Sequence, residues 1–208
     1  MEDYQETMIK MRNGVAFANK TLMPALKEIE YISEHAEILF EDANENARIL
    51  GKMLKKNGKK RQVVTRNTIR SSCACVEGFA YVLKHALKMT IDTTPPELFN
   101  KKQREFINGD FLNGSGAENY KLALKCFAKK YNIDVSQMFG TQEFEQLQQA
   151  FELRNRLMHP KSSDDLHVTF DDARLLSSAI VWFIHSQHEV FNQIYAQIEK
   201  QADELLVV

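Results

Sequence analysis

The chain has 208 residues with 27 Lys and Arg against 28 Asp and Glu, and its formal net charge of -1 argues against polyanion binding through overall charge. No apolar run approaches the length of a membrane span. Proline and glycine are scarce and helix formers abound, so we expect an all-α fold. No linker-like segment separates two apolar blocks, which predicts a single domain over residues 1–208.

The first quarter of the chain is expected to be helical. Residues 4–19 are helix-like with weak periodicity, and Thr21 and Pro24 suit the cap and first turn of a second helix. This helix is predicted to run to about Lys56 and to end at a turn formed by Asn57 and Gly58. Its apolar residues recur at three- and four-residue steps: Leu26, Ile29, Ile32, Ala36, Leu39, Ala43, Ala47, Leu50 and Leu54.

Charges are segregated along this region. Residues 28–45 contain seven acids and no Lys or Arg, whereas residues 48–70 contain nine bases and no acid. Two interpretations stay open, namely a solvated helix end that complements the helix macrodipole and a track for an RNA backbone. No aromatic residues are interleaved to stack bases. The bases concerned are Lys52, Lys55, Lys56, Lys59, Lys60, Arg61, Arg66 and Arg70.

The next helix is predicted from about Val63 to Lys88. Its middle, residues 72–80, is rich in small residues that allow close helix packing, so we expect it at the centre of a bundle. Glu77 lies in this segment as a candidate buried carboxylate and would need a partner there, for which Arg154 and Arg70 are the candidates.

Three shorter elements follow in the pattern of the sequence. A short helix is expected from Pro95 to Phe106, a flexible loop from Asn108 to Gly116, and an amphipathic helix from Glu118 to Tyr131. The inward side of the last is predicted to carry Leu122, Leu124, Phe127 and Ala128.

The helix that follows ends in an unusual set of polar side chains. Thr141 is expected to cap a helix over residues 142–158, and Pro160 prevents its continuation, which leaves His159 at the helix end. Asn155 and His159 are four residues apart and share a face, and Arg154 lies about 100° round from Asn155.

The final helix has a clear start and one apolar stripe. Residues 169–172 have the capping-box pattern with Asp in place of Glu, after a polar loop over 160–168. One short extended segment is expected, near residues 167–169. The helix is predicted to reach about Lys200 with the apolar residues Leu176, Ile180, Phe183, Ile184, Phe191, Ile194 and Ile198.

The segment from Arg154 to His159 resembles the Arg-x4-His motif of the HEPN superfamily, in which a polar residue commonly follows the Arg. The resemblance covers about residues 61–200. It implies a HEPN-like helical bundle, here with an additional long N-terminal helix in residues 1–60 packed on a core of residues 61–200. It also implies a homodimer in which two motifs meet across a two-fold axis, and a metal-independent endoribonuclease without cofactors that acts in defence or in a toxin–antitoxin system.

The resemblance assigns roles that suit the side chains. His159 would take the proton of the attacking 2′-hydroxyl or protonate the leaving 5′-oxygen. Arg154 would stabilise the phosphorane with two hydrogen bonds, which an ammonium does less well. Asn155 would orient backbone or phosphate groups, and Arg156 and Lys161 would contact substrate phosphates. The expected products carry a 2′,3′-cyclic phosphate and a 5′-hydroxyl.

Other interpretations of the motif remain open. In one interpretation, His159 has no catalytic role and serves as a C-terminal cap of its helix, where a cationic imidazole is favoured. The same fold can serve as a non-catalytic module that binds nucleic acid, nucleotide or a protein partner. Some relatives carry a tyrosine two residues after the histidine, which a partner antitoxin modifies. Lys161 occupies that position here, which argues against that form of control by an antitoxin.

Cysteines and the remaining histidines give no metal pattern. An odd number of cysteines suits a reducing cytoplasm, and Cys73, Cys75 and Cys126 are expected to be core thiols without zinc. His185, His188 and Glu189 have a spacing that can hold a metal from one helix, but no third ligand is indicated and a solvated face is favoured.

Overall fold

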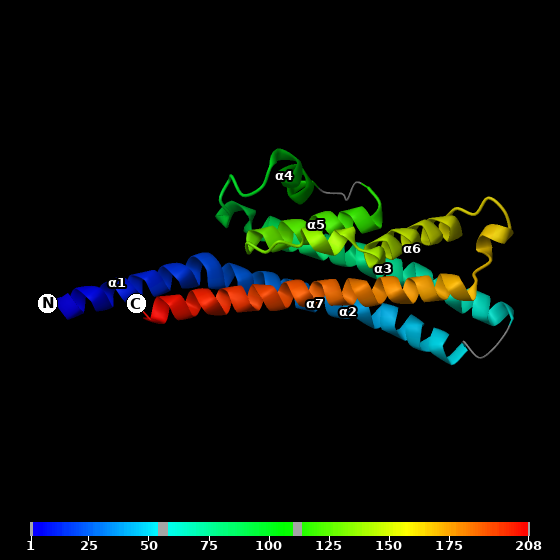
Figure 1. Ribbon diagram of the computed structural model, residues 1–208, viewed down its shortest axis with the longest axis horizontal. Helices are drawn as coiled ribbons and strands as arrows, with labels where there is room; N and C mark the ends of the chain where they lie inside the picture. The colour runs from blue at the N-terminus through cyan, green and yellow to red at the C-terminus, as the bar shows by residue number, and fades with distance from the viewer. Residues whose placement is uncertain (1, 54–57, 110–113, 208) are drawn as a thin grey trace.

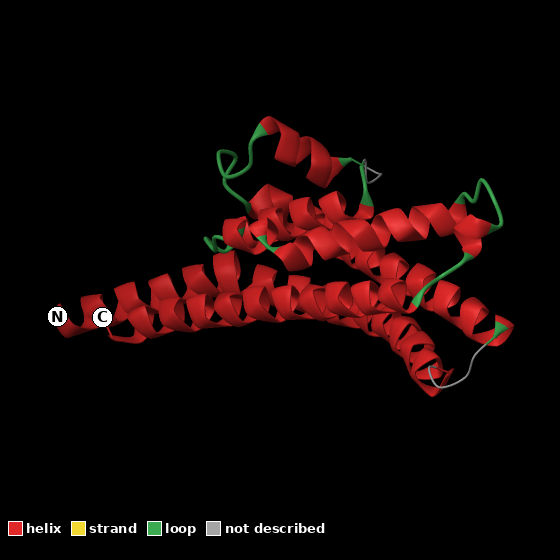
Figure 2. Cartoon of the chain, turned by 45° about the vertical axis from the view of Figure 1, so that its right-hand side comes forward, coloured by secondary structure: helices red, strands yellow, loops and turns green. Residues whose placement is uncertain are grey.

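The computed structural model describes residues 2–53, 58–109 and 114–207, and these residues form helices and connecting turns without any strand. The chain is all-α, as predicted. Figures 1 and 2 show long helices running side by side, with a shorter helix on top. The helices are α1 Glu2–Phe17, α2 Met23–Met53, α3 Lys59–Thr90, α4 Lys101–Asn108, α5 Gly116–Lys130, α6 Gln142–Met158 and α7 Phe170–Val207.

Helix α3 lies at the centre of the bundle, as its small residues predicted. It packs against α2, α5, α6 and α7, and α6 also packs along α7. Helix α1 and the C-terminal part of α7 extend together beyond the bundle, so both termini lie at the same end (Figure 1). None of the described helices combines the length and the apolar character that crossing a membrane requires.

The predicted helix start at Thr21 is wrong. The chain is helical from residue 2 to residue 53, and Thr21 lies inside a π-helical segment over Ala18–Leu22. Pro24 has no N–H to offer the carbonyl of Lys20, and a π-helical turn directly before it is one way for a helix to accommodate the missing bond. The predicted end near Lys56 and the turn residue Asn57 lie outside the described residues.

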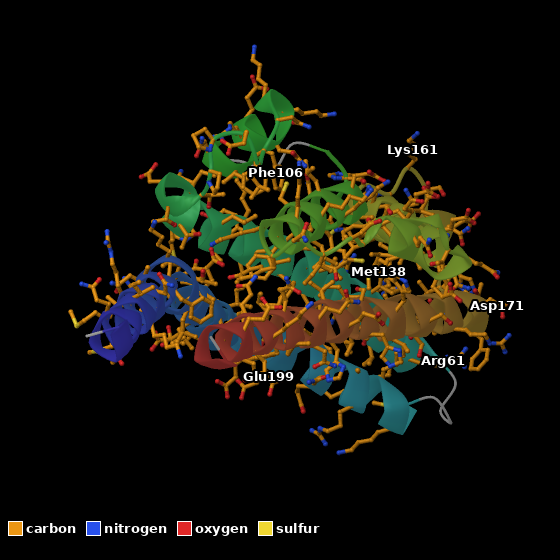
Figure 3. All side chains as sticks on the ribbon, turned by 60° about the vertical axis from the view of Figure 1, so that its left-hand side comes forward. Arg61, Phe106, Met138, Lys161, Asp171 and Glu199 are labelled. Atoms are coloured by element: carbon orange, nitrogen blue, oxygen red, sulfur yellow. The ribbon has the colours of Figure 1, made fainter. Side chains whose placement is uncertain are left out.

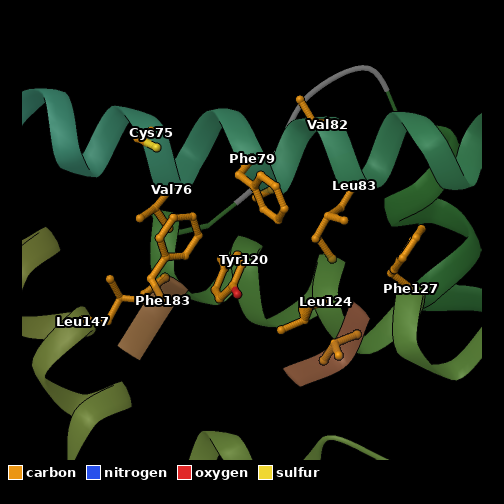
Figure 4. Close-up of a cluster of buried hydrophobic side chains, with 14 of the residues drawn as sticks. Cys75, Val76, Phe79, Val82, Leu83, Tyr120, Leu124, Phe127, Leu147 and Phe183 are labelled. Carbon is orange, nitrogen blue, oxygen red and sulfur yellow. The ribbon is translucent and has the colours of Figure 1, made fainter. Parts of the chain in front are cut away.

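The core is formed where α3, α5 and α7 meet. Phe79, Leu83, Tyr120 and Phe183 are almost fully buried there (Figure 4). All three cysteines are buried free thiols, as predicted. Burial raises the pKa of Cys73 and of Cys126 to about 12 and that of Cys75 to about 11.

Helices α4 and α5 start at different residues from those predicted. Asn100 and Gln103 form a capping box in which each side chain accepts the other's backbone N–H, so α4 begins at Lys101 rather than at Pro95. Ser115 caps α5, which begins at Gly116 instead of Glu118. The expected loop is therefore shorter, and residues 110–113 lie outside the described part of the chain.

Two residues that the sequence predicts to face the core are not fully buried. Ile184 is 43% exposed, so it lies outside the buried stripe of α7. Leu122 of α5 is half-buried and packs against the core, whereas Leu124, Phe127 and Ala128 are buried.

The capping box at the start of α7 is confirmed, because Asp172 Oδ2 accepts the backbone N–H of Thr169 at 2.7 Å. His167, in the expected extended segment, has extended backbone angles without forming a strand.

A buried charged network joins α2 to the C-terminal ends of α3 and α5. Glu28 is fully buried and its Oε2 accepts the hydroxyl of Tyr131 at 2.6 Å. Lys130 and Thr90 both donate to Glu28 Oε1, and Lys130 Nζ also donates to Thr90 Oγ1 at 2.7 Å. Burial and the adjacent carboxylate raise the pKa of Tyr131. The network fixes the position of α2 against the ends of α3 and α5.

Gly116 lies where α5 closely approaches α6. A Cβ atom at this position would lie 2.1 Å from Cε1 of Phe151 and 2.8 Å from Cγ of Glu77. We expect Gly116→Ala to lower the free energy of unfolding by about 1–3 kcal/mol, because a buried aromatic ring must move. Urea denaturation measures the change. Gly14→Ala, where a Cβ meets nothing within 4 Å, is the matched helical control, and equal stability of the two variants would contradict the expectation.

Candidate functional site

Helix α6 ends as its sequence predicted. Thr141 Oγ1 accepts the backbone N–H of Phe144, and the helix runs over Gln142–Met158. His159 has φ -128° and ψ 58°, outside the helical region, while its backbone N–H still bonds to the carbonyl of Asn155 at 3.0 Å. The His159 side chain is exposed and has no hydrogen bond or ion pair with any described residue. Its imidazole is therefore accessible to a bound molecule.

Arg154 is held between two acceptors. Its Nη2 donates to Oε2 of Glu77 on α3, and its Nη1 donates to Oδ1 of Asn155 at 2.9 Å. The Arg154 side chain is 23% exposed and that of Glu77 is 35% exposed, so the prediction of a buried Glu77 carboxylate is wrong. Of the two partners considered for Glu77, Arg154 is therefore the correct one. Two of the five guanidinium N–H groups are used, so others remain to bind an anion.

Arg70 supports the helix end instead of pairing with Glu77. Its Nη2 donates to the carbonyl of Leu157 at 2.9 Å. This carbonyl is one of the last four in α6, which lack a partner within the helix. A cation is also favourable at a helix C-terminus. Arg70 therefore stabilises the turn from which His159 projects.

The N-terminal half of α3 also holds the loop after the motif. Gln62 forms two hydrogen bonds with the backbone of Val168, at 2.7 and 2.9 Å, and Arg66 Nη1 donates to the carbonyl of Leu166 at 2.9 Å. Two of the bases considered as an RNA track, Arg66 and Arg70, thus bind the protein's own backbone. Of the others, Lys52, Lys59 and Lys60 are exposed, and Lys55 and Lys56 lie outside the described residues.

The two predicted substrate contacts flank the helix end. Arg156 Nη2 lies 3.6 Å from Oδ2 of Asp172, so it connects α6 with the start of α7. Lys161 is exposed and points away from the bundle (Figure 3). Its backbone N–H donates to Oδ2 of Asp165 at 2.7 Å, as does that of Ser162 at 3.0 Å, and these bonds hold the pKa of Asp165 below its usual range.

The structure brings Arg154 and Asn155 into direct contact and leaves His159 exposed about one and a half turns further along. Glu77, which the sequence predicts to need a partner, joins the site through its ion pair with Arg154. The arrangement offers an oriented guanidinium for a phosphate and an accessible imidazole for proton transfer.

Potential metal ligands do not gather in the described part of the chain, where no three His, Cys, Asp or Glu side chains lie close enough to hold an ion. His188 instead contacts Asn192, with 3.1 Å between Nδ1 and Nδ2, and Glu189 accepts from Gln193 at 3.0 Å.

No family model matches the chain, and comparisons with curated proteins and with solved structures gave no match. The resemblance to the HEPN superfamily therefore rests on the chain's own residues. Those residues are Arg154, Asn155 and His159 at the end of one helix and Glu77 on the central helix.

Proposed function

We propose that this chain is a HEPN-like endoribonuclease that cleaves RNA without a metal. The observation that carries the proposal is the presence of an oriented Arg154 and an exposed His159 within the last two turns of one helix. Glu77 and Asn155 fix the direction of the guanidinium, and a group held in advance stabilises developing charge without reorganising.

The proposed reaction is an internal transfer at one phosphodiester. The 2′-oxygen forms a bond to phosphorus, the bond from phosphorus to the 5′-oxygen breaks, and no water enters in this step. The proton leaves the 2′-hydroxyl for a neutral imidazole, and the 5′-oxygen receives one from a cationic imidazole. Arg154 binds the non-bridging oxygens as charge develops on them. The products are a 2′,3′-cyclic phosphate and a 5′-hydroxyl.

One imidazole cannot be neutral and cationic at once, so the reaction is best served by two. A homodimer that brings two copies of His159 to one phosphate would supply a base and an acid together. We therefore include the homodimer in the proposal. A place in the cytoplasm and a role in defence or in a toxin–antitoxin pair, with an antitoxin as partner, belong to the same proposal and rest on the resemblance alone.

A second function is favoured by one observation. Glu77 neutralises Arg154, as in an ion pair that serves only to join α3 and α6. In that case the chain would be a binding module for nucleic acid, nucleotide or protein, without turnover. The two functions differ in whether purified protein cleaves RNA.

The conservative variant Arg154→Lys tests the role of the guanidinium. We expect RNA cleavage to fall by about a hundredfold, because an ammonium keeps the charge but lacks the planar fork that can bind Glu77 and Asn155 and still present N–H groups to phosphate oxygens in a fixed direction. Initial rates on a labelled single-stranded RNA measure the change. Arg12→Lys on α1 is the matched control and should cleave at the parental rate. Undiminished cleavage by Arg154→Lys would remove the proposed role of Arg154.

A further inference from the structure

A groove opens between α2 and α7 at the end of the bundle that carries the motif. Figure 1 shows the C-terminal part of α2 diverging from α7 there. The groove contains a cavity of about 420 Å³, a volume within the usual range of ligand pockets. It is lined by Ala47, Leu50, Gly51, Thr68, Ser72, Phe170, Ala173, Arg174, Leu176, Ser177, Ile180 and Val181.

The inner wall of this cavity is apolar with a polar edge. Leu50 and Leu176 are buried there, and Ser72 is only 4% exposed yet forms no hydrogen bond with any described residue. Its hydroxyl belongs to the cavity wall and has no protein partner among the described residues, so it is available to a ligand. Thr68 gives its hydroxyl proton to the carbonyl of Val64 at 3.0 Å or to that of Asn46 at 3.2 Å, which leaves its oxygen free to accept.

The mouth of the cavity carries an exposed aromatic ring. Phe170 is 59% exposed, and the guanidinium carbon of Arg174 lies 5.2 Å from the centre of its ring. The side chain of Arg174 is itself 70% exposed and lies 3.7 Å from Asp171. Flat bases of single-stranded RNA bind on aromatic rings and guanidinium planes of this kind.

Basic residues lie on the helices that line the cavity, and the exposed acid Asp171 lies beside Phe170. Lys52 follows Gly51 on α2, and Lys59 and Lys60 begin α3; all three are exposed. Figure 3 places Arg61 at the same end of the bundle as Asp171, next to Phe170 in the chain. The ion pair between Arg156 and Asp172 connects this mouth to the motif helix.

We propose that the cavity between α2 and α7 binds one base of the RNA substrate, at a distance along the strand from the phosphate that is cleaved. The base stacks on Phe170, its edge meets the hydroxyls of Ser72 and Thr68, and the flanking phosphates meet the exposed lysines. This inference deepens the proposed function and rests on it, because it takes RNA as the substrate.

The test uses a single-stranded 2′-O-methyl RNA, which cannot be cleaved because it lacks the attacking hydroxyl. Fluorescence anisotropy gives its affinity for the full chain and for its variants. We expect Phe170→Ala to weaken binding about tenfold, the effect of losing one stacked base. Gly51→Leu should weaken it similarly by filling the cavity, without lowering the melting temperature, since leucine is a better helix former than glycine.

Matched controls isolate the base. Gly14→Leu makes the same change on α1, where a Cβ likewise meets nothing within 4 Å, and should bind as the parent does. An abasic strand of equal length should bind the parent, Phe170→Ala and Gly51→Leu with one affinity, because only its phosphates contribute. Such a pattern would establish a base-binding cavity.

The inference is overturned if all proteins bind the base-containing strand equally. It is also overturned if Gly51→Leu changes the oligomeric state but not the affinity, which would make the groove a protein contact. Cleavage of unmodified RNA, measured in parallel, separates this from the proposed function. Cleavage that needs His159 but not Phe170 or an open cavity would support the proposed ribonuclease and overturn the base-binding cavity. Binding that needs Phe170 without any cleavage would leave only the base site.

Discussion

Replacing His159 with alanine is expected to reduce RNA cleavage by about a hundredfold or more, the usual contribution of a general acid or base. The protein should keep its stability within about 0.5 kcal/mol, as for most exposed substitutions, because the imidazole is exposed and has no bond to a described residue. Cleavage rates and urea denaturation of the same preparation measure both quantities.

His185→Ala is the control for this variant, since His185 is also exposed but lies on α7, outside the motif. It should match the parent in rate and stability. A purely structural role of His159 predicts a different result for the His159→Ala variant. In that case His159→Ala would lose about 1 kcal/mol or more of stability, as for a lost helix cap, and the RNA would remain intact with the parent as well.

Removing Glu28 is expected to have the largest effect on stability. Glu28→Ala removes the common acceptor of the Lys130 ammonium and of the hydroxyls of Tyr131 and Thr90. The side chain of Lys130 is only 12% exposed. We expect the free energy of unfolding to fall by about 3–5 kcal/mol, as for a buried ion pair broken on one side. Urea denaturation followed by circular dichroism measures it.

Glu34→Ala is the matched control, because Glu34 is an exposed acid on the same helix. Its stability should stay within about 0.5 kcal/mol of the parent. A loss below about 1 kcal/mol in Glu28→Ala would contradict the role given to the network. The folded fraction of this variant should still cleave RNA, because Glu28 contacts the C-terminal ends of α3 and α5 rather than the end of α6.

The parts of the fold that depend on neighbouring residues were predictable from the sequence. The bounds of α6, the cap at Thr141 and the capping box closed by Asp172 follow from side chains that bond to backbone within three residues. The position of His159 follows from the proline after it. One longer contact, between Glu77 and Arg154, was among the two considered, because a charged group in an apolar helix needs a partner.

Contacts between distant segments were not predictable in this way. Nothing local indicates that Glu28 meets Lys130, more than a hundred residues away, or that Arg66 and Arg70 bind carbonyls after and within α6. Helix periodicity also misplaced Ile184, which is exposed although its spacing along α7 matches the apolar stripe. These features depend on how whole helices pack.

The most direct test of the proposed ribonuclease is incubation of the purified protein with total RNA in EDTA, beside the His159→Ala variant, with analysis of the ends of any fragments. We predict cleavage by the parent alone, leaving 2′,3′-cyclic phosphate and 5′-hydroxyl ends. Intact RNA in several pools, with both proteins folded and dimeric, would contradict the account and favour a binding module.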